Sequence, residues 1–171
     1  GTPSKAPSYH HLKMAFRIVG YLNNTKALPL CLGGKKPIEV IGYSDASLAT
    51  GPNSRSVVGE LTKLNDEAGT VKAKCKALPG VSLSSFEAEL EALFKSMKSI
   101  REIQNILDDM EVIRVKPSRG YTDNKAMQQF VKSDGVTKGV KHMEMRLWAL
   151  RLEYLKGDIR YEHMPGTEIP A

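Results

Sequence analysis

The sequence predicts an α/β fold, a mixed five-stranded sheet with helices packed on it. Three observations support this fold class. Three strand-like segments separated by turn residues occupy residues 38–78. A long helical segment with an apolar stripe follows them, and strand-like and helical segments then alternate to residue 164. Because consecutive strands pair antiparallel and a helix between two strands makes a parallel connection, the sheet should contain both kinds of pair.

The first three strands are expected at 38–44, 57–64 and 70–78. The segment 49–55, which contains Gly51-Pro52-Asn53, is expected to be the turn after the first strand, and residues 65–69 have the composition of a hairpin turn. In the third strand, Lys72, Lys74 and Lys76 alternate with small residues, which places all three on one face. This row fits a solvated edge that resists aggregation or a contact with nucleic acid, and the pattern does not choose between them.

The rest of the predicted fold is one long helix, a strand, two shorter helices and a final strand. The long helix begins at Ser84 or Ser85, both of which are good N-cap residues, and runs to about Met110. The later elements are expected at 112–122 with an interruption at Pro117-Ser118, 124–132, 143–155 and 159–164.

The start of the chain is expected to form a separate segment. Apolar residues at helical spacing predict a helix over residues 8–24, and a short strand is expected at residues 28–32. Gly33-Gly34-Lys35-Lys36-Pro37 has the composition of a linker or turn. We therefore expect two parts, residues 1–35 and residues 36–171.

Composition limits the class of protein. The 171 residues suit one domain with a short appendage, and the formal net charge of +6 favours a polyanionic partner such as nucleic acid. No apolar run is long enough for a transmembrane helix, so no membrane partner is expected. Cys31 and Cys75 form no disulfide or zinc pattern, so we expect a reducing compartment and two small core residues.

Acidic residues follow two strands that the predicted topology makes parallel neighbours. Asp45 ends the first strand and Asp123 ends the fourth, and functional sites gather where parallel strands end. A third acid should come from the long helix. At about 100° per residue, Glu89 lies at the edge of the apolar stripe beside the sheet, whereas Glu87 and Glu91 point toward solvent. Crowded carboxylates repel unless cations neutralise them, and their oxygens favour Mg²⁺ or Mn²⁺.

Four segments, in this order, resemble motifs of the ribonuclease H domain of copia-like retrotransposon polyproteins. They are Tyr43-Ser44-Asp45-Ala46, residues 83–93, Thr122-Asp123-Asn124-Lys125-Ala126 and Lys141-His142-Met143-Glu144-Met145-Arg146. The leading residues 11–25, with Arg17-Ile18-Val19-Gly20-Tyr21-Leu22, are similar to the stretch that joins this domain to the polymerase.

The resemblance implies a ribonuclease H-like fold at residues 36–171 and an endonuclease that cuts the RNA strand of RNA–DNA hybrids. Two Mg²⁺ or Mn²⁺ ions would be the cofactors, and the reverse transcriptase domain of the same polyprotein would be a partner, joined through residues 1–35. Asp45, Glu89 and Asp123 match the family's catalytic metal ligands, with Asp45 shared by both ions. The family's fourth aspartate is expected next after Ala171, and by motif neither Asp158 nor Glu168 takes its place.

Further residues are candidate contacts to the hybrid. Those for sugar or phosphate, for which local capping is an equally good interpretation, are Ser47, Ser85 and Asn124. Those for phosphate are Lys125, Lys141, His142 and Arg146. Trp148 is expected in the core, in one helix stripe with Met145 and Leu152.

The main alternative is a module of the same fold that binds hybrid nucleic acid without cutting it. An integrase or transposase of this broad fold fits less well, because those enzymes carry their last glutamate on a later helix, whereas Glu89 precedes the fourth strand. The expected location is the cytoplasm, in a virus-like particle, or the nucleus, and secretion is not expected.

Overall fold

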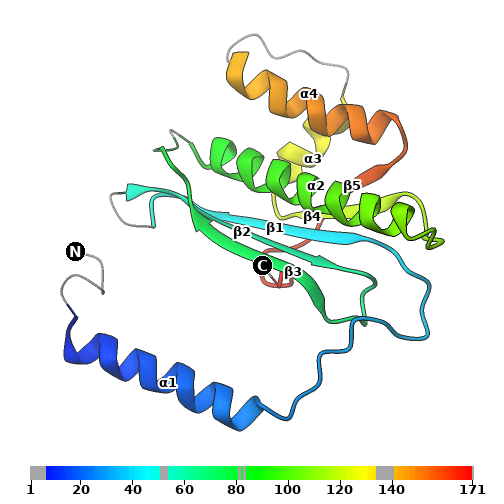
Figure 1. The fold of residues 1–171 in the computed structure, drawn as a ribbon. Coiled ribbons are helices and arrows are strands. Elements are labelled where there is room, and N and C mark those ends of the chain that lie inside the picture. Colours follow the sequence, from blue (N-terminus) through cyan, green and yellow to red (C-terminus); the bar gives the residue numbers. More distant parts are fainter. Residues whose placement is uncertain (1–6, 51–53, 81, 83, 134–140, 171) are drawn as a thin grey trace. The chain divides into compact units, whose positions relative to one another are not determined.

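The structure is a computed structural model, and it describes residues 7–50, 54–80, 82, 84–133 and 141–170 (Figure 1). The side chains of residues 141–144 lie outside this description. Contacts divide the chain into two compact units, Gly1–Leu30 and Cys31–Ala171. The sequence placed the division after residue 35, a few residues further along.

The first unit holds a single described helix, α1 (Tyr9–Thr25), where the sequence predicted one. At its start the backbone N–H of Ser8 donates to Nδ1 of His11 over 3.0 Å. The strand expected at residues 28–32 was wrong, because these residues form neither a strand nor a helix. Pro29 has no N–H for a sheet ladder. The backbone hydrogen bonds described here run from Leu28 N–H to Thr25 O over 2.9 Å and from Gly69 N–H to Cys31 O over 2.6 Å.

The second unit is built on the predicted mixed sheet, whose five described strands have the order β3-β2-β1-β4-β5. The strands are β1 (Ile41–Ser47), β2 (Val57–Lys63), β3 (Thr70–Ala77), β4 (Ser118–Thr122) and β5 (Ile159–His163). The pairs β1–β2 and β2–β3 are antiparallel, and the pairs β1–β4 and β4–β5 are parallel. The sheet therefore places β1 and β4 side by side at its centre.

Strand β4 is shorter than the expected segment 112–122. Residues 112–116 instead connect the preceding helix to the sheet. Val112 N–H donates to Leu107 O of α2 over 2.8 Å, and Val115 N–H donates to Ile38 O, before β1, over 2.7 Å. Pro117 then lacks the N–H that a ladder needs, so the strand begins at Ser118.

Three helices lie over one face of the sheet (Figure 1). They are α2 (Ser85–Asp109), α3 (Lys125–Lys132) and α4 (Lys141–Leu155). Of the two cap candidates for α2, Ser84 is the N-cap, and its side chain accepts from Glu87 N–H over 3.1 Å. Buried side chains between the helices and the sheet form the main core, among them Leu90, Leu93, Ile100, Met127, Leu150 and Tyr161.

Helix α2 lies against β1 at very short range. A Cβ atom built on Gly42 would come within 2.6 Å of Ser96 Oγ and 2.7 Å of Ile100 Cδ1. Only a residue without a side chain fits here, so Gly42 sets how closely α2 approaches the centre of the sheet.

Two expectations about the core were wrong. Trp148 is 53% exposed, and Met145 and Leu152 are exposed with it, because α4 turns the side that carries Leu150 toward the core. Cys31 and Cys75 are also exposed. Among the described residues, no helix is both long and apolar enough to cross a membrane.

Candidate metal centre

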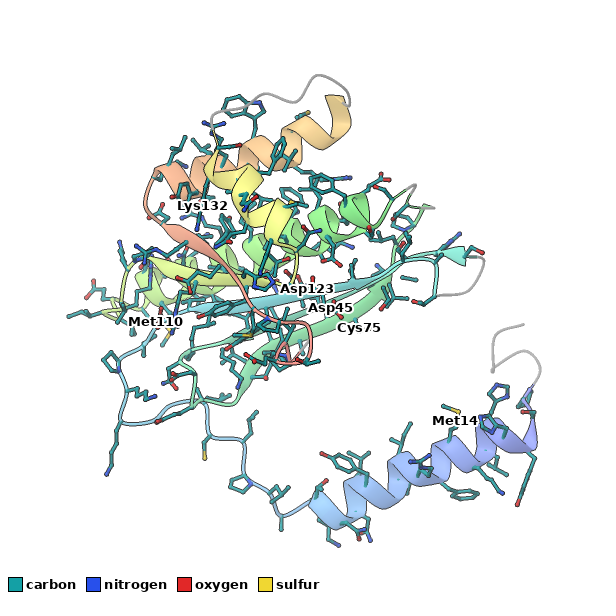
Figure 2. All side chains as sticks on the ribbon, turned by 180° about the vertical axis from the view of Figure 1, so that it is seen from behind. Met14, Asp45, Cys75, Met110, Asp123 and Lys132 are labelled. Carbon is teal, nitrogen blue, oxygen red and sulfur yellow. The ribbon has the colours of Figure 1, made fainter. Side chains whose placement is uncertain are left out.

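Three carboxylates from distant parts of the chain meet at one end of the sheet. Asp45 comes from β1, Glu89 from the start of α2, and Asp123 from the residue after β4. Each offers one oxygen atom, and these three atoms all lie within 4.8 Å of one another. Figure 2 labels Asp45 and Asp123, which lie next to each other although they come from segments far apart in the chain.

The parallel pairing of β1 and β4 brings the two aspartates together. Tyr43 faces Tyr121 in the register, and each aspartate lies two residues further along its strand direction. Ser44 ties the strands at this point, since its hydroxyl donates to Tyr121 O over 3.0 Å. The backbone therefore fixes how close the two carboxylates lie.

Glu89 is the buried member of the cluster. Its side chain is 7% exposed, and its Oε2 atom is buried without a hydrogen-bond partner among the described residues. The pKa of Glu89 is raised to about 8, first by burial and then by the negative charges of Asp123 and Asp45. The backbone N–H of Ala46 donates to this carboxylate and lowers the pKa in part.

These residues fit a divalent cation. An unpartnered buried carboxylate oxygen beside two further carboxylates costs free energy, which a hard cation with oxygen ligands would offset. The donor set contains no sulfur or imidazole, so it favours Mg²⁺ or Mn²⁺ over zinc.

The sequence did not single out Gly166, which lies beside the cluster. A Cβ atom built on Gly166 would lie 3.2 Å from Asp123 Oδ2, so the turn after β5 comes within contact distance of this carboxylate. In the sequence, Pro165-Gly166 indicated only a turn. The turn lies beside the end of β4 because β4 and β5 pair in parallel, which the local sequence does not show.

The predicted contacts to sugar or phosphate lie beside the cluster in the chain. Ser47 and Ser85 are exposed at the end of β1 and the start of α2. Asn124 caps α3, with its side chain accepting from Met127 N–H over 3.0 Å. The capping role expected as an alternative is thus present at Asn124, and its contact with a substrate stays a prediction.

The candidate phosphate contacts fall into three groups. Lys125 is exposed at the first position of α3, directly after Asp123 and Asn124. The side chains of Lys141 and His142 lie outside the described residues. Arg146 forms an ion pair across to α2, with its Nε atom 3.0 Å from Glu91 Oε2.

Glu91 was wrongly expected to point to solvent. Its side chain is 17% exposed and lies between Arg146 of α4 and Lys95, whose Nζ atom is 3.6 Å from Glu91 Oε1. The position of a residue relative to the apolar stripe shows which side of α2 faces the sheet, but it does not show that a second helix packs beside α2. Helix α4 covers the side of α2 that carries Glu91. Asp158 lies away from the cluster in an ion pair with Arg101.

Comparison with solved structures identifies the fold. The chain resembles ribonuclease H1 from Halobacterium salinarum, with 17% identity and a TM-score of 0.54 over 75% of this chain and 87% of that one. It also resembles a compost-derived ribonuclease H1 solved with an RNA/DNA hybrid, with 12% identity and a TM-score of 0.58 over 77% of this chain and 89% of that one. The chain has the ribonuclease H fold.

The ribonuclease H fold also occurs within longer polymerase chains. A foamy viral protease-reverse transcriptase, solved with an RNA/DNA hybrid, matches 81% of this chain through 20% of its own length, with 18% identity and a TM-score of 0.56. No protein-family model matches the chain.

Proposed function

We propose that this chain is the ribonuclease H domain of a copia-like retrotransposon polyprotein and that it hydrolyses the RNA strand of RNA–DNA hybrids. The observation that carries the proposal is the convergence of Asp45, Glu89 and Asp123 on a ribonuclease H fold. The hybrids bound in two of the similar solved structures support the choice of substrate. Residues 1–35 would join the domain to a reverse transcriptase, inside a cytoplasmic virus-like particle.

Asp45, Glu89 and Asp123 would hold the divalent ions. A pair of Mg²⁺ or Mn²⁺ ions, when bound, activates water and stabilises the leaving oxygen of a phosphodiester. The chain's own contribution is to hold three carboxyl groups together: Ala46 N–H donates to the Glu89 carboxyl group, and Ser44 fixes the spacing of the two strands that carry the aspartates. Ser47, Ser85 and Asn124 would contact the sugar or phosphate of the RNA strand, where the 2′-hydroxyl distinguishes it from DNA.

Basic and hydrogen-bonding side chains around this end would hold the rest of the duplex. Lys125 follows the cluster directly, and Lys141, His142 and Arg146 come from the start of α4. Such contacts bind phosphates without reading sequence, so affinity should fall as salt rises.

A binding module that does not cut is the second candidate. The cluster among the described residues contains three acids, whereas the family pattern implies four. Three carboxylates still attract cations and shape the surface for a hybrid, so binding would persist without hydrolysis.

Hydrolysis of a labelled RNA–DNA hybrid with Mg²⁺ or Mn²⁺ tests the proposal. We expect cleavage of the RNA strand in the hybrid, no cleavage of duplex DNA, and loss of cleavage in Asp45→Asn. Asp109→Asn is a matched control, since Asp109 is an exposed acid at the far end of α2. Tight binding without cleavage would favour the binding module, and cleavage that survives Asp45→Asn would contradict the assigned site.

A further inference from the structure

A groove lies between the edge strand β3 and helix α2, with a volume of about 720 Å³. Its walls carry positive side chains from two elements, β3 and α2, and from the loop before β2. These are Arg55, Lys72, Lys74, Lys76, Lys95 and Lys98. We call it the β3–α2 groove.

The lysine row of β3 faces this groove. Lys72 forms an ion pair with Glu102 of α2, which fixes the side of the strand on which it lies. Side chains alternate along a strand, so Lys74 and Lys76 share that side and follow at steps of about 6.8 Å. The row that the sequence left open between a solvated edge and a nucleic-acid contact therefore lines a groove beside a helix.

Positive charge exceeds negative charge in the groove. Three acids line it, Glu60, Glu91 and Glu102, against six cations. Each acid has a lysine near it: Glu102 pairs with Lys72, Glu60 Oε1 lies 3.7 Å from Lys74 Nζ, and Glu91 pairs with Lys95. Three cations form no ion pair with any described residue: Arg55, Lys76 and Lys98.

The groove begins at the end of the sheet that carries the carboxylate cluster. Asp45 pairs with Gly59 of β2, and Gly59 pairs with Cys75 of β3, directly before Lys76. Two strand spacings separate Asp45 from Cys75 by about 10 Å at the backbone, and the next side chain, Lys76, points to the α2 side of the sheet. From there the groove follows α2 away from the cluster to Lys98 and Lys72.

We propose that the β3–α2 groove binds the phosphate backbone of a single-stranded nucleic-acid tail that continues from the duplex at the carboxylate cluster. The proposal rests on the proposed function for the duplex but adds a second binding surface. No aromatic side chain lines the groove among the described residues, so bases find no stacking platform and binding is electrostatic and independent of sequence. An acidic protein partner is less consistent, because the apolar lining is limited to small side chains that offer no anchoring pocket.

Binding of two fluorescent probes to the full chain tests this proposal. One probe is a blunt RNA–DNA hybrid, and the other is the same hybrid with a single-stranded tail, of DNA or RNA, on either end. All proteins carry Asp45→Asn to prevent cutting. The groove variant combines Arg55→Gln, Lys76→Gln and Lys98→Gln, which removes the three cations that have no ion pair. The control combines Lys35→Gln, Lys116→Gln and Arg160→Gln, three exposed cations outside the groove with the same total charge change.

The unsubstituted groove should bind at least one tailed probe more tightly than the blunt probe. Three phosphate contacts predict a slope of log affinity against log salt that is steeper by about 2 for the tailed probe. This difference should vanish in the groove variant and persist in the control. No gain from any tail, or an equal loss in the control, would overturn the proposal.

Cutting of the blunt hybrid by the unsubstituted chain separates this result from the proposed function. Cleavage of the blunt hybrid without tighter binding of a tailed probe would contradict the groove proposal and support the nuclease function. Tighter binding of a tailed probe without cleavage would support the groove proposal and contradict the nuclease function.

Discussion

Asp45 and Asp123 occupy equivalent positions on two neighbouring parallel strands. Each lies two residues beyond one of the paired residues Tyr43 and Tyr121, whose rings stack with their centroids 5.4 Å apart on the face opposite the helices. The stacked pair and the Ser44 hydrogen bond hold the strands in this register. Like charges are thus held close by the fold itself, and the predictions below follow from that relationship.

Loss of either aspartate should abolish cleavage without unfolding the chain. We expect Asp45→Asn and Asp123→Asn each to lower hydrolysis of the hybrid by about a hundredfold or more, since even indirect partners of metal ligands are typically worth about 10–100-fold. In the absence of divalent ions both variants should melt at the same or a higher temperature, because one of two repelling charges is gone. Thermal melts in chelator and a cleavage assay measure the two effects; a lower melting temperature in both variants would contradict the repulsion.

The metal-free protein should lose stability as the pH rises from about 4.5 to about 8. The pKa of Glu89 is raised from 4.5 to about 8 by burial and by Asp123 and Asp45, so between these values the folded state holds a proton that the unfolded state has released. The contribution of this proton to the free energy of unfolding is fully present below pH 4.5 and is lost as the pH rises to about 8. Denaturant unfolding at a series of pH values in chelator measures this contribution.

Glu89→Gln supplies the control for that pH dependence. The amide has no proton to lose, so we expect the stability of this variant to vary less between pH 4.5 and pH 8 and to exceed that of the unsubstituted chain at pH 8. Mg²⁺ should restore stability at pH 8 to the unsubstituted chain and not to the variant, because a ligand that binds only the folded state stabilises it. Parallel pH profiles for the two proteins would rule out Glu89 as the source.

Gly42→Ala should destabilise the domain. The new Cβ atom would lie 2.6 Å from Ser96 Oγ and 2.7 Å from Ile100 Cδ1, so α2 must move away from β1. Overpacking of this kind costs about 1–3 kcal/mol or more in the free energy of unfolding. Gly80→Ala is the control, because a Cβ atom there meets nothing within 4 Å. Equal midpoints of denaturant unfolding for the two variants would contradict the close approach.

Gly166→Ala should weaken metal binding while leaving the fold intact. Its Cβ atom would lie 3.2 Å from Asp123 Oδ2, which forces the carboxylate or the turn to shift by a few tenths of an ångström. We expect Mg²⁺ affinity, measured by calorimetry, to fall by roughly tenfold, the lower end of the range for groups that orient metal ligands. Gly80→Ala again serves as the control, and an unchanged affinity would show that the turn yields without moving Asp123.

Local patterns in the sequence predicted most of the elements and the cluster, but not the missing strand at residues 28–32 or the short length of β4. A cap predicted the start of α2, and the alternation of strands and helices predicted the mixed sheet. The angle of Glu89 to the apolar stripe identified it as the acid that reaches the sheet, and it is buried there. These inferences succeeded because caps, periodicity and strand ends depend on residues that are close together in the chain.

Only the tertiary structure decided which flanks of the helices and the sheet are covered. Periodicity assigned Trp148 to the core and Glu91 to solvent, whereas α4 presents Leu150 to the core and places Arg146 against Glu91. The lysine row of β3 was visible in the sequence, but its position beside α2 was not. An apolar stripe records that a helix packs against something; which neighbour occupies each flank depends on contacts between residues far apart in the chain, which no local pattern encodes.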